Sequence, residues 1–365
     1  MPTVVPFSDD LAEILYTSGS TGVPKGVPLT HRGQLWALAN YHTPIEARNS
    51  PGSTLVVAPL YHMNGLFFTT VALANRVTVL SLPRFDARLY LETVARHRCT
   101  MLSGIPSMFA LMVRERELAA QLRLDAVREV SIGSAPLTDT LLRRVQQLFP
   151  EATIKNGFGT TEAGPAVFGP HPQGLRTPPL ALGYPLKSVS WRLVDGTTPD
   201  EGVLALRTPA LMEGYLNLPA VTAEKMRDGW YLTGDIMRRD AEGFFYFVGR
   251  ADDMFVCGGE NIYPTEVERM LERHAHVQQA AVVPAPDDVQ GQIPVAFIVP
   301  QRGIRPSVEE ITRYALSHGP AYAHPRFIVF REQLPVASTH KIDRAALMAE
   351  AARLSHDAGR ASTGG

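Results

Sequence analysis

The chain has 365 residues, with 35 lysines and arginines against 36 aspartates and glutamates, and a formal net charge of −1. This balance argues against a nucleic-acid or membrane partner that depends on a net basic surface. At roughly 150 residues per domain, the length suggests about two to three domains. Cys99 and Cys257 are too few to staple such a chain by disulfides, so we expect a reducing, cytoplasmic location.

Apolar β-branched runs alternate with helical patterns through the first part of the chain. We expect short buried strands at 54–60, 77–82, 100–106 and 127–133, and helices at 88–97, 107–118 and 137–149. In the last of these helices, Leu141, Leu142, Val145 and Leu148 share one face. This alternation predicts a largely parallel α/β sheet.

The pattern changes twice further along the chain. From about 178 to 249, short strands separated by Gly and Asp predict an antiparallel, barrel-like part. From 252 to 365, helices and strands predict a small α+β domain that ends in a frayed polar tail from Ser355. We therefore expect a large domain over 1–251 and a small one over 252–365. The N-terminus lacks a signal-peptide pattern, and no stretch reaches the ~18 apolar residues of a membrane span.

The segment from Tyr16 to Gly26 is the strongest local signal for chemistry. It concentrates hydroxyl residues, glycines and one lysine: Thr17, Ser18, Gly19, Ser20, Thr21, Gly22 and Lys25. Glycines allow backbone N–H groups to approach an anion, hydroxyls donate hydrogen bonds, and a lysine adds a positive charge. A flexible surface loop has a similar composition. The segment is not a Walker loop, because Gly26 follows the lysine.

Seven further motifs follow in the same order as in a known superfamily. The motifs are PLYHMNG (59–65), GSAP (133–136), GFGTTEAG (157–164), GWYLTGD (229–235), GRADD (249–253), GGENIYP (258–264) and STHKI (338–342). On these residues the chain resembles the adenylate-forming superfamily, and within it the acyl- and aryl-CoA synthetases. These enzymes activate a carboxylic acid with ATP and Mg²⁺, and they pass the acyl group to coenzyme A.

The resemblance implies roles for residues of the large domain. Residues 17–25 would hold the β- and γ-phosphates, Glu162 would bind magnesium, and Thr161 would lie near the α-phosphate. Gly133, Ser134 and Ala135 would line the adenine pocket, Phe158 could stack on adenine, and Gly159 would belong to the same nucleotide site. Asp235 would accept both ribose hydroxyls, and Arg250 would make a second ribose or phosphate contact. Taken singly, Glu162 could equally be a surface acid and Asp235 the cap of a turn.

The resemblance also implies an alternating small domain. Lys341 would reach the α-phosphate and the carboxylate during adenylation, and Asp252 would be the hinge. After rotation, Gly258, Gly259 and Glu260 would line a narrow tunnel for the pantetheine arm of coenzyme A. A glycine pair is also common in an ordinary loop between strands.

His62 is expected to line the acyl pocket or to orient the carboxylate, although a lone histidine is often only structural. Amino-acid-activating domains typically carry an aspartate in this motif, and none occurs here. The pocket walls would be small or apolar: Met63, Leu66, Ile105, Gly157, Phe158, Gly164 and Val167. An uncharged aromatic or medium aliphatic acid is therefore expected.

Members of this superfamily carry a further α/β segment before the phosphate loop, so we expect a large domain that is shortened at its N-terminus. A partner or a second copy would then cover the exposed side. Two alternatives stay open. The chain could be a non-catalytic or half-active nucleotide- or adenylate-binding subunit, or it could load a phosphopantetheine carrier protein instead of free coenzyme A.

Overall fold

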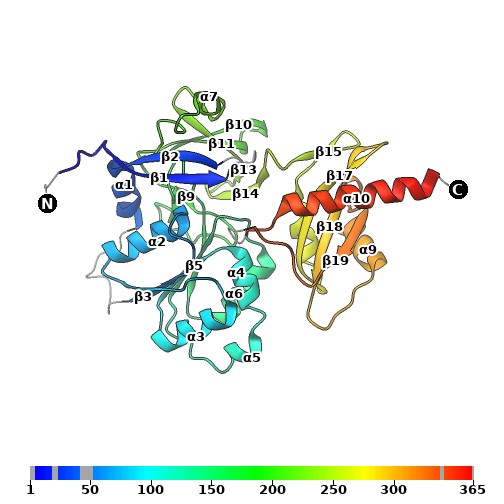
Figure 1. Ribbon diagram of the computed structural model, residues 1–365, viewed down its shortest axis with the longest axis horizontal. Helices are drawn as coiled ribbons and strands as arrows, with labels where there is room; N and C mark the ends of the chain where they lie inside the picture. The colour runs from blue at the N-terminus through cyan, green and yellow to red at the C-terminus, as the bar shows by residue number, and fades with distance from the viewer. Residues whose placement is uncertain (1–4, 19–23, 42–51, 338–340, 364–365) are drawn as a thin grey trace. The chain divides into compact units, whose positions relative to one another are not determined.

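The computed structural model describes residues 5–18, 24–41, 52–337 and 341–363. It divides into two compact units (Figure 1). The large unit comprises Met1–Leu137 and Leu141–Phe247, and the small unit comprises Thr138–Thr140 and Val248–Gly365. Each unit has its own hydrophobic core. Within the described ranges, no helix is long and apolar enough to cross a membrane.

The centre of the large unit is a parallel sheet, as the alternating pattern predicts. Its strand order is β4-β3-β5-β6-β7, and every neighbouring pair is parallel. The strands are β3 (Ser53–Val56), β4 (Thr78–Ser81), β5 (Met101–Gly104), β6 (Glu129–Gly133) and β7 (Thr153–Gly157). The chain winds from β3 to β4 in one direction and from β5 to β7 in the other. The direction of winding therefore changes between β3 and β5, and α/β proteins bind ligands at the carboxyl ends of strands next to such a switch point.

Helices contribute to two separate hydrophobic cores of this unit. One core contains residues of α1 (His31–Tyr41) and α2 (Met63–Ala74). The other contains residues of α3 (Ala87–His97), α4 (Pro106–Met112) and α6 (Asp139–Leu148). The expected helix over 107–118 is in fact α4 followed by the short α5 (Arg116–Ala119), because Glu115 between them leaves the helical backbone region.

An antiparallel sheet completes the large unit, which confirms the second predicted part. Its order is β10-β11-β13-β12, and β14 pairs with β13. The strands are β10 (Ser190–Thr198), β11 (Glu201–Arg207), β12 (Met226–Arg227), β13 (Trp230–Arg239) and β14 (Phe245–Arg250), and α7 (Pro219–Lys225) precedes β12. The hairpin of β1 (Leu11–Ser18) and β2 (Pro24–Thr30) shares a core with this sheet through Leu15, Val27 and Leu29. A two-stranded piece, β8 (Phe168–Gly169) with β9 (Tyr184–Pro185), lies between the two sheets in the sequence.

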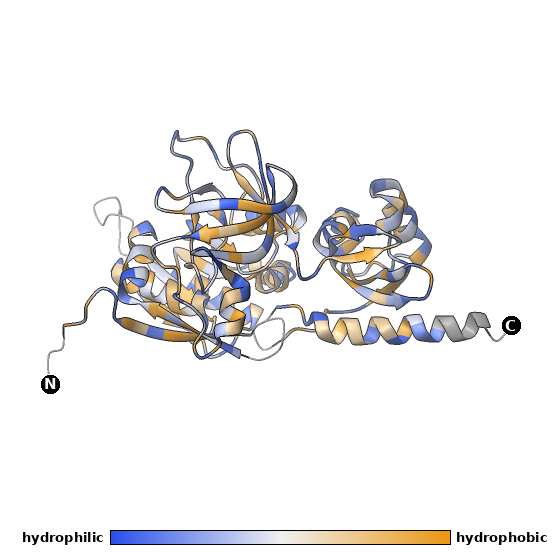
Figure 2. Ribbon diagram, turned by 90° about the horizontal axis from the view of Figure 1, so that it is seen from above, coloured by the Kyte–Doolittle hydropathy of each residue, from blue (hydrophilic) through white to orange (hydrophobic). Residues whose placement is uncertain are grey.

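The small unit is an α+β module built on one sheet of order β16-β15-β18-β17, with β19 parallel to β18. Its strands are β15 (Phe255–Cys257), β16 (Glu260–Ile262), β17 (Val277–Asp287), β18 (Gly291–Pro300) and β19 (Phe327–Phe330). Its helices are α8 (Pro264–Glu272), α9 (Val308–His318), the 3₁₀ turn η2 (Ala321–Ala323) and α10 (Arg344–Thr363). Figure 2 shows hydrophobic residues on both strands and helices, alternating with hydrophilic ones.

The C-terminal segment differs from the sequence prediction. The segment from Ser355, expected to be a frayed tail, continues α10 as far as Thr363. The alanine-rich start of this helix buries Leu347 and Ala351, and Ser355 donates a 2.6 Å hydrogen bond to the carbonyl of Pro286. An anchored helix propagates readily through alanines, which have the highest helix propensity.

Candidate functional site

The β1–β2 hairpin carries the predicted phosphate-binding residues. Thr17 and Ser18 end β1, Lys25 lies near the start of β2, and the register places Thr17 opposite Lys25. The predicted Gly19, Ser20, Thr21 and Gly22 lie outside the described residues. Among the described residues of this segment, Lys25 has the surroundings that bear most directly on anion binding.

Lys25 is buried, with 8% of its surface exposed. Its Nζ lies 5.5 Å from the centroid of the Tyr215 ring, in a cation–π contact. The backbone N–H of Leu216 donates a 2.9 Å hydrogen bond to the carbonyl of Gly26, and this holds the Tyr215 segment against β2. A buried lysine is rare unless it is paired with an anion, so the burial of Lys25 favours the binding of a negatively charged group at this site.

Glu162 supplies a carboxylate beside the same tyrosine. The Tyr215 hydroxyl donates a 2.9 Å hydrogen bond to Oε1 of Glu162, which is 9% exposed. The loop that carries Glu162 is tight: Thr160 and Gly164 exchange two backbone hydrogen bonds. The N–H of Met212 donates to the Glu162 carbonyl at 2.8 Å. Both the backbone and the side chain of Glu162 are therefore fixed by the segment around Tyr215.

Asp235 and Tyr231, both on β13, extend this cluster. Asp235 is 6% exposed, and its N–H donates a 3.0 Å hydrogen bond to Oγ1 of Thr233. Burial raises the pKa of Tyr231 well above its usual value, and the nearby Glu162, Tyr215 and Asp235 raise it further. Tyr231 thus lies within the electrostatic reach of both carboxylates. Its high pKa keeps its hydroxyl protonated and able to donate a hydrogen bond.

The predicted adenine-pocket residues lie together at the carboxyl ends of β6 and β7. Gly133 is opposite Gly157 in the register. A Cβ at Gly133 would lie 2.8 Å from the carbonyl oxygen of Gly157, so only glycine fits there. Ser134 has a positive φ of 64°, which turns the chain away from the sheet before Ala135.

Phe158 and Gly159 follow β7 directly. The Phe158 ring lies 5.8 Å from that of Phe168 and packs against the core of the antiparallel part. A Cβ at Gly159 would lie 2.1 Å from the carbonyl oxygen of Pro165, so glycine is required by the tight loop that presents Thr161 and Glu162. The predicted nucleotide residues of β6 and β7 therefore share one edge of the sheet.

His62 lies between β3 and α2, at the switch-point end of the sheet. It is the N-cap residue of α2, and its ring centroid lies 4.6 Å from that of Tyr61. A Cβ at Gly65 would lie 2.4 Å from the carbonyl oxygen of Ala58, so the first turn of α2 packs directly on the preceding loop. The expected pocket walls are divided between two cores: Ile105 belongs to one, and Met63, Leu66, Phe158 and Val167 to the other.

The small unit carries the remaining predicted residues. Arg250 and Asp252 form an ion pair at 2.9 Å, so the expected ribose contact and the expected hinge residue are paired with each other. Gly258 and Gly259 are the two turn residues of the β15–β16 hairpin, with φ of 59° and 91°. Two positive φ values in a two-residue hairpin turn favour glycine whatever else the segment does. Lys341 is exposed, and its carbonyl accepts a 2.8 Å hydrogen bond from the N–H of Ala337.

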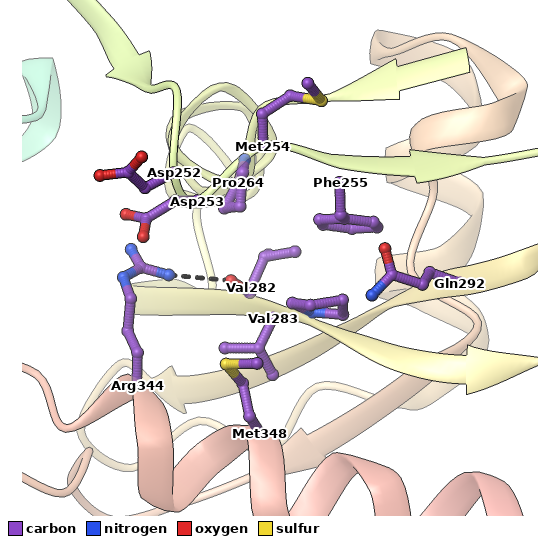
Figure 3. A pocket seen from close by; sticks show the side chains of 11 residues that line it. Asp252, Asp253, Met254, Phe255, Pro264, Val282, Val283, Gln292, Arg344 and Met348 are labelled. Carbon is purple, nitrogen blue, oxygen red and sulfur yellow. Dashed lines mark hydrogen bonds between the residues drawn. The ribbon is translucent and has the colours of Figure 1, made fainter. Parts of the chain in front are cut away.

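A cavity of about 200 Å³ also lies in the small unit (Figure 3). Asp252, Asp253 and Arg344 line it together with apolar side chains such as Met254 and Phe255. Of the predicted site residues, Asp252 alone is among those that line this cavity.

Tyr215 and Tyr231 are the site residues that sequence reasoning missed. Tyr231 lies inside the GWYLTGD motif, in which the resemblance assigns a role only to Asp235. Tyr215, in the segment Gly214–Leu216, carries no spacing that sets it apart from a core tyrosine. Its role follows only from the fold, which brings it between Lys25 and Glu162.

A parallel sheet with facing glycines at the carboxyl ends of two strands, in a unit that also buries a lysine and two carboxylates, is typical of nucleotide-binding α/β proteins. Comparison with known families makes this specific. Residues 1–216 match the AMP-binding enzyme family, and residues 266–341 match the AMP-binding enzyme C-terminal domain. The chain therefore belongs to the AMP-binding enzyme family.

Individual relatives agree with this assignment. The chain is 32% identical over 355 residues to a long-chain-fatty-acid–CoA ligase of Bacillus subtilis, covering 93% of this chain and 62% of the relative. It is 33% identical over 341 residues to a feruloyl-CoA synthase of Amycolatopsis, covering 92% of this chain and 68% of the relative. The chain thus spans about two thirds, or slightly less, of the length of these relatives.

A solved structure is similar over the same extent. The anthranilate CoA ligase AuaEII, in complex with anthranoyl-AMP, superposes with a TM-score of 0.84 at 27% identity. The match covers 96% of this chain and 69% of that structure. The fold is accordingly that of an adenylate-forming enzyme.

Proposed function

We propose that this chain is an AMP-forming acid–CoA ligase. It would activate a carboxylic acid with ATP, giving an acyl-adenylate and pyrophosphate, and would then transfer the acyl group to the thiol of coenzyme A. The observation that carries the proposal is the buried cluster of Lys25, Glu162 and Asp235 around Tyr215 and Tyr231.

The first half-reaction brings a carboxylate to the α-phosphate of ATP, so two anions must meet. A site can promote this by neutralising charge and by aligning the reactants. Lys25 offers a positive charge in a partly dehydrated setting, where electrostatic interactions are stronger than in water. Thr17, Ser18 and the residues that follow would donate hydrogen bonds to the β- and γ-phosphates.

The residues around Glu162 fit a magnesium ion. Mg²⁺ prefers oxygen ligands and is usually held by one or two carboxylates together with substrate phosphates. Tyr215 orients the Glu162 carboxylate through Oε1, and the Thr161 hydroxyl is adjacent in the sequence. When bound, the ion would neutralise phosphate charge and so assist the release of pyrophosphate.

The adenosine part of the substrate fits the edge formed by β6 and β7. Gly133, Ser134 and Ala135 leave space for a flat base, and Phe158 offers an aromatic face. Asp235 would accept hydrogen bonds from the ribose hydroxyls, and Arg250 would make a second contact. The rigid backbone of Asp235, held by Thr233, supports this role.

The acid would be an uncharged aromatic or medium aliphatic carboxylate. His62 would line this pocket beside the apolar Met63, Leu66, Ile105 and Val167. No acidic side chain occurs in the motif 59–65, which argues against an amino-acid substrate. Two of the similar proteins, the feruloyl-CoA synthase and the anthranilate CoA ligase, are named for aromatic acids.

The second half-reaction would use the small unit. Lys341 would assist adenylation, and the Gly258–Gly259 turn would approach the thiol after rotation about Asp252. The acceptor is either free coenzyme A or the phosphopantetheine of a carrier protein.

A cytoplasmic location is part of the proposal, supported by two buried, unpaired cysteines. We also propose that a second copy of the chain or a partner protein packs against the large unit.

The test is ATP–pyrophosphate exchange with a panel of aromatic, aliphatic and dicarboxylic acids, followed by CoA-dependent release of AMP. We expect exchange with an uncharged acid. Measurable ATP binding without exchange for any acid would instead support the alternative of a non-catalytic binding subunit.

A variant separates the two half-reactions. Lys341→Ala should slow adenylation far more than thioester formation from preformed acyl-adenylate. Lys187→Ala, which removes an exposed lysine of the large unit, serves as the matched control. Equal losses in both steps for Lys341→Ala would contradict the alternating role of the small unit.

A further inference from the structure

The small unit contains a cluster of two imidazoles and one carboxylate that the proposed reaction does not use. Within the described part of the chain, the ligand atoms of His274, His276 and Glu310 all lie within 4.8 Å of one another. His274 and His276 lie in the turn between α8 and β17, and Glu310 lies in the first turn of α9.

Both imidazoles face the same carboxylate oxygen. Nδ1 of His276 lies 2.5 Å from Oε1 of Glu310, and Nε2 of His274 lies 3.4 Å from it. The Tyr314 ring packs edge-on against His274, with centroids 4.7 Å apart, on the helix turn that follows Glu310. The three side chains are partly exposed, at 13%, 43% and 36% in chain order, so an ion could reach them from solvent.

The backbone holds the cluster in place. The N–H of Glu310 donates to Oγ of Ser307, the N-cap residue of α9, at 3.1 Å. The N–H of Val277 donates to the carbonyl of His274 at 3.0 Å, and the N–H of Gln301 donates to that of His276 at 2.9 Å. A ligand set on fixed turns and a capped helix end loses little conformational entropy when it binds an ion.

We propose that His274, His276 and Glu310 form a binding site for a divalent transition-metal ion, with zinc as the best match. Imidazole suits zinc, copper and nickel, whereas Mg²⁺ and Ca²⁺ prefer an all-oxygen set. Tetrahedral zinc places its ligands about 2.0–2.1 Å from the metal. The three donor atoms lie within 4.8 Å of one another, and water would complete the coordination.

Coordination has a proton requirement that follows from the geometry. The N–H of His276 donates to Nδ1 of His274 at 3.2 Å, so the neutral His274 ring carries its proton on Nε2. Binding through Nε2 moves that proton to Nδ1, so Nδ1 no longer accepts the hydrogen bond from the His276 N–H. If the neutral His276 ring carries its proton on Nδ1, binding through Nδ1 moves that proton to Nε2 of the same ring. The site would then tie the α8–β17 turn to α9 within the small unit.

To test this, the full chain is first freed of bound metal with a chelator. It is then titrated with ZnCl₂ in a non-coordinating buffer by isothermal titration calorimetry. His276→Ala and Glu310→Gln should each weaken zinc binding at least tenfold. His318→Ala is the matched control, because His318 lies on α9 but bonds to Tyr314 and Ser317. Binding of one equivalent that is the same in all four proteins, or no binding by the unaltered chain, would overturn the proposal.

A second measurement guards against variants that fold poorly. Zinc should raise the thermal unfolding midpoint of the unaltered chain and of His318→Ala, but not that of Glu310→Gln or the milder His276→Gln. Co²⁺ in place of zinc should give visible absorption bands that disappear with Glu310→Gln. An unchanged cobalt spectrum in that variant would place the ion among other histidines and would refute the site. None of these readouts depends on ligase activity.

Discussion

The Tyr215 hydroxyl donates a 2.9 Å hydrogen bond to Oε1 of Glu162, and Nζ of Lys25 lies 5.5 Å from the centroid of the same tyrosine ring. One buried side chain thus contacts both the cation and the carboxylate of the candidate site. We therefore expect Tyr215 to act as a positioning residue for the charged groups that would meet ATP and magnesium.

Tyr215→Phe should lower kcat/KM for ATP–pyrophosphate exchange by about 10- to 100-fold. A hydrogen bond to a charged group contributes about 1.5–3 kcal/mol, and the ring that packs against Lys25 is retained. We also expect the Mg²⁺ concentration for half-maximal exchange to rise, because a less well-oriented Glu162 binds the ion more weakly.

Tyr246→Phe is the matched control for that variant. Its hydroxyl donates to a carboxylate oxygen of Asp240 at the same distance, 2.9 Å. Neither Tyr246 nor Asp240 is a predicted site residue. It should leave exchange and its Mg²⁺ dependence unchanged. Similar losses in both variants would mean that Tyr215 acts only through general stability.

The facing glycines of β6 and β7 should respond differently to the same substitution. Gly133→Ala places a Cβ 2.8 Å from the carbonyl oxygen of Gly157, whereas Gly157→Ala meets nothing closer than 3.5 Å. The first change should lower the free energy of unfolding by about 1–3 kcal/mol through overpacking and weaken ATP binding. The second should change stability by less than about 1 kcal/mol. Urea denaturation and nucleotide titration of the pair provide the check, and equal effects would contradict the assigned packing.

Glu268 and Arg344 form an ion pair in the small unit, in which Glu268 is buried and Arg344 is partly exposed. Oε1 of Glu268 accepts hydrogen bonds from Arg344 at 2.7 Å and from the N–H of Val282 at 2.8 Å. Burial opposes the charge of Arg344, but Glu268 more than offsets this, so the pKa of Arg344 lies above its usual value. Glu268→Gln removes the hydrogen-bonded counter-ion of Arg344 and leaves Asp253 as an acidic neighbour.

We expect Glu268→Gln to lower the free energy of unfolding of the small unit by about 1.5–3 kcal/mol, the contribution of a hydrogen bond between charged groups. Glu350→Gln is the control, because its partner Arg331 is 40% exposed and such pairs contribute less than about 1 kcal/mol. Denaturant unfolding of both variants measures the difference. A loss no larger than that of the control would refute a stabilising role for the Glu268–Arg344 pair.

Stability should fall at alkaline pH through Tyr246. Burial and the hydrogen bond to Asp240 raise its pKa from 10.0 to about 12. The folded state therefore favours the protonated hydroxyl. This contribution is complete below pH 10 and is lost as the pH rises from 10 through 12.

The measurement is the free energy of unfolding in urea across that pH interval. Tyr246→Phe should give a shallower decline, because it removes one group whose pKa differs between the folded and unfolded states. Tyr61→Phe, at an exposed tyrosine of the same unit, should retain the original slope. Parallel slopes for Tyr246→Phe and the unaltered chain would show that another group controls the alkaline transition.

Much of the fold follows from local pattern. The strands β3 to β6 and the helices α3 and α6 were predictable because short apolar runs and one-sided helical faces record which residues are buried. The Gly258–Gly259 pair was harder to interpret, since a tunnel lining and a hairpin turn require the same backbone freedom. Its two positive φ values identify the hairpin turn, whereas its part in thioester formation stays a prediction.

The sequence alone determined the class of this protein, because ordered motifs such as GFGTTEAG and GWYLTGD carry chemistry in short contiguous segments. The length of 365 residues suggested two or three domains, and the structure divides into two compact units. Only the tertiary structure decided that Tyr215 joins Lys25 to Glu162, and that His274, His276 and Glu310 converge. Those contacts link residues far apart in the chain, and only packing fixes such distances, which periodicity does not encode.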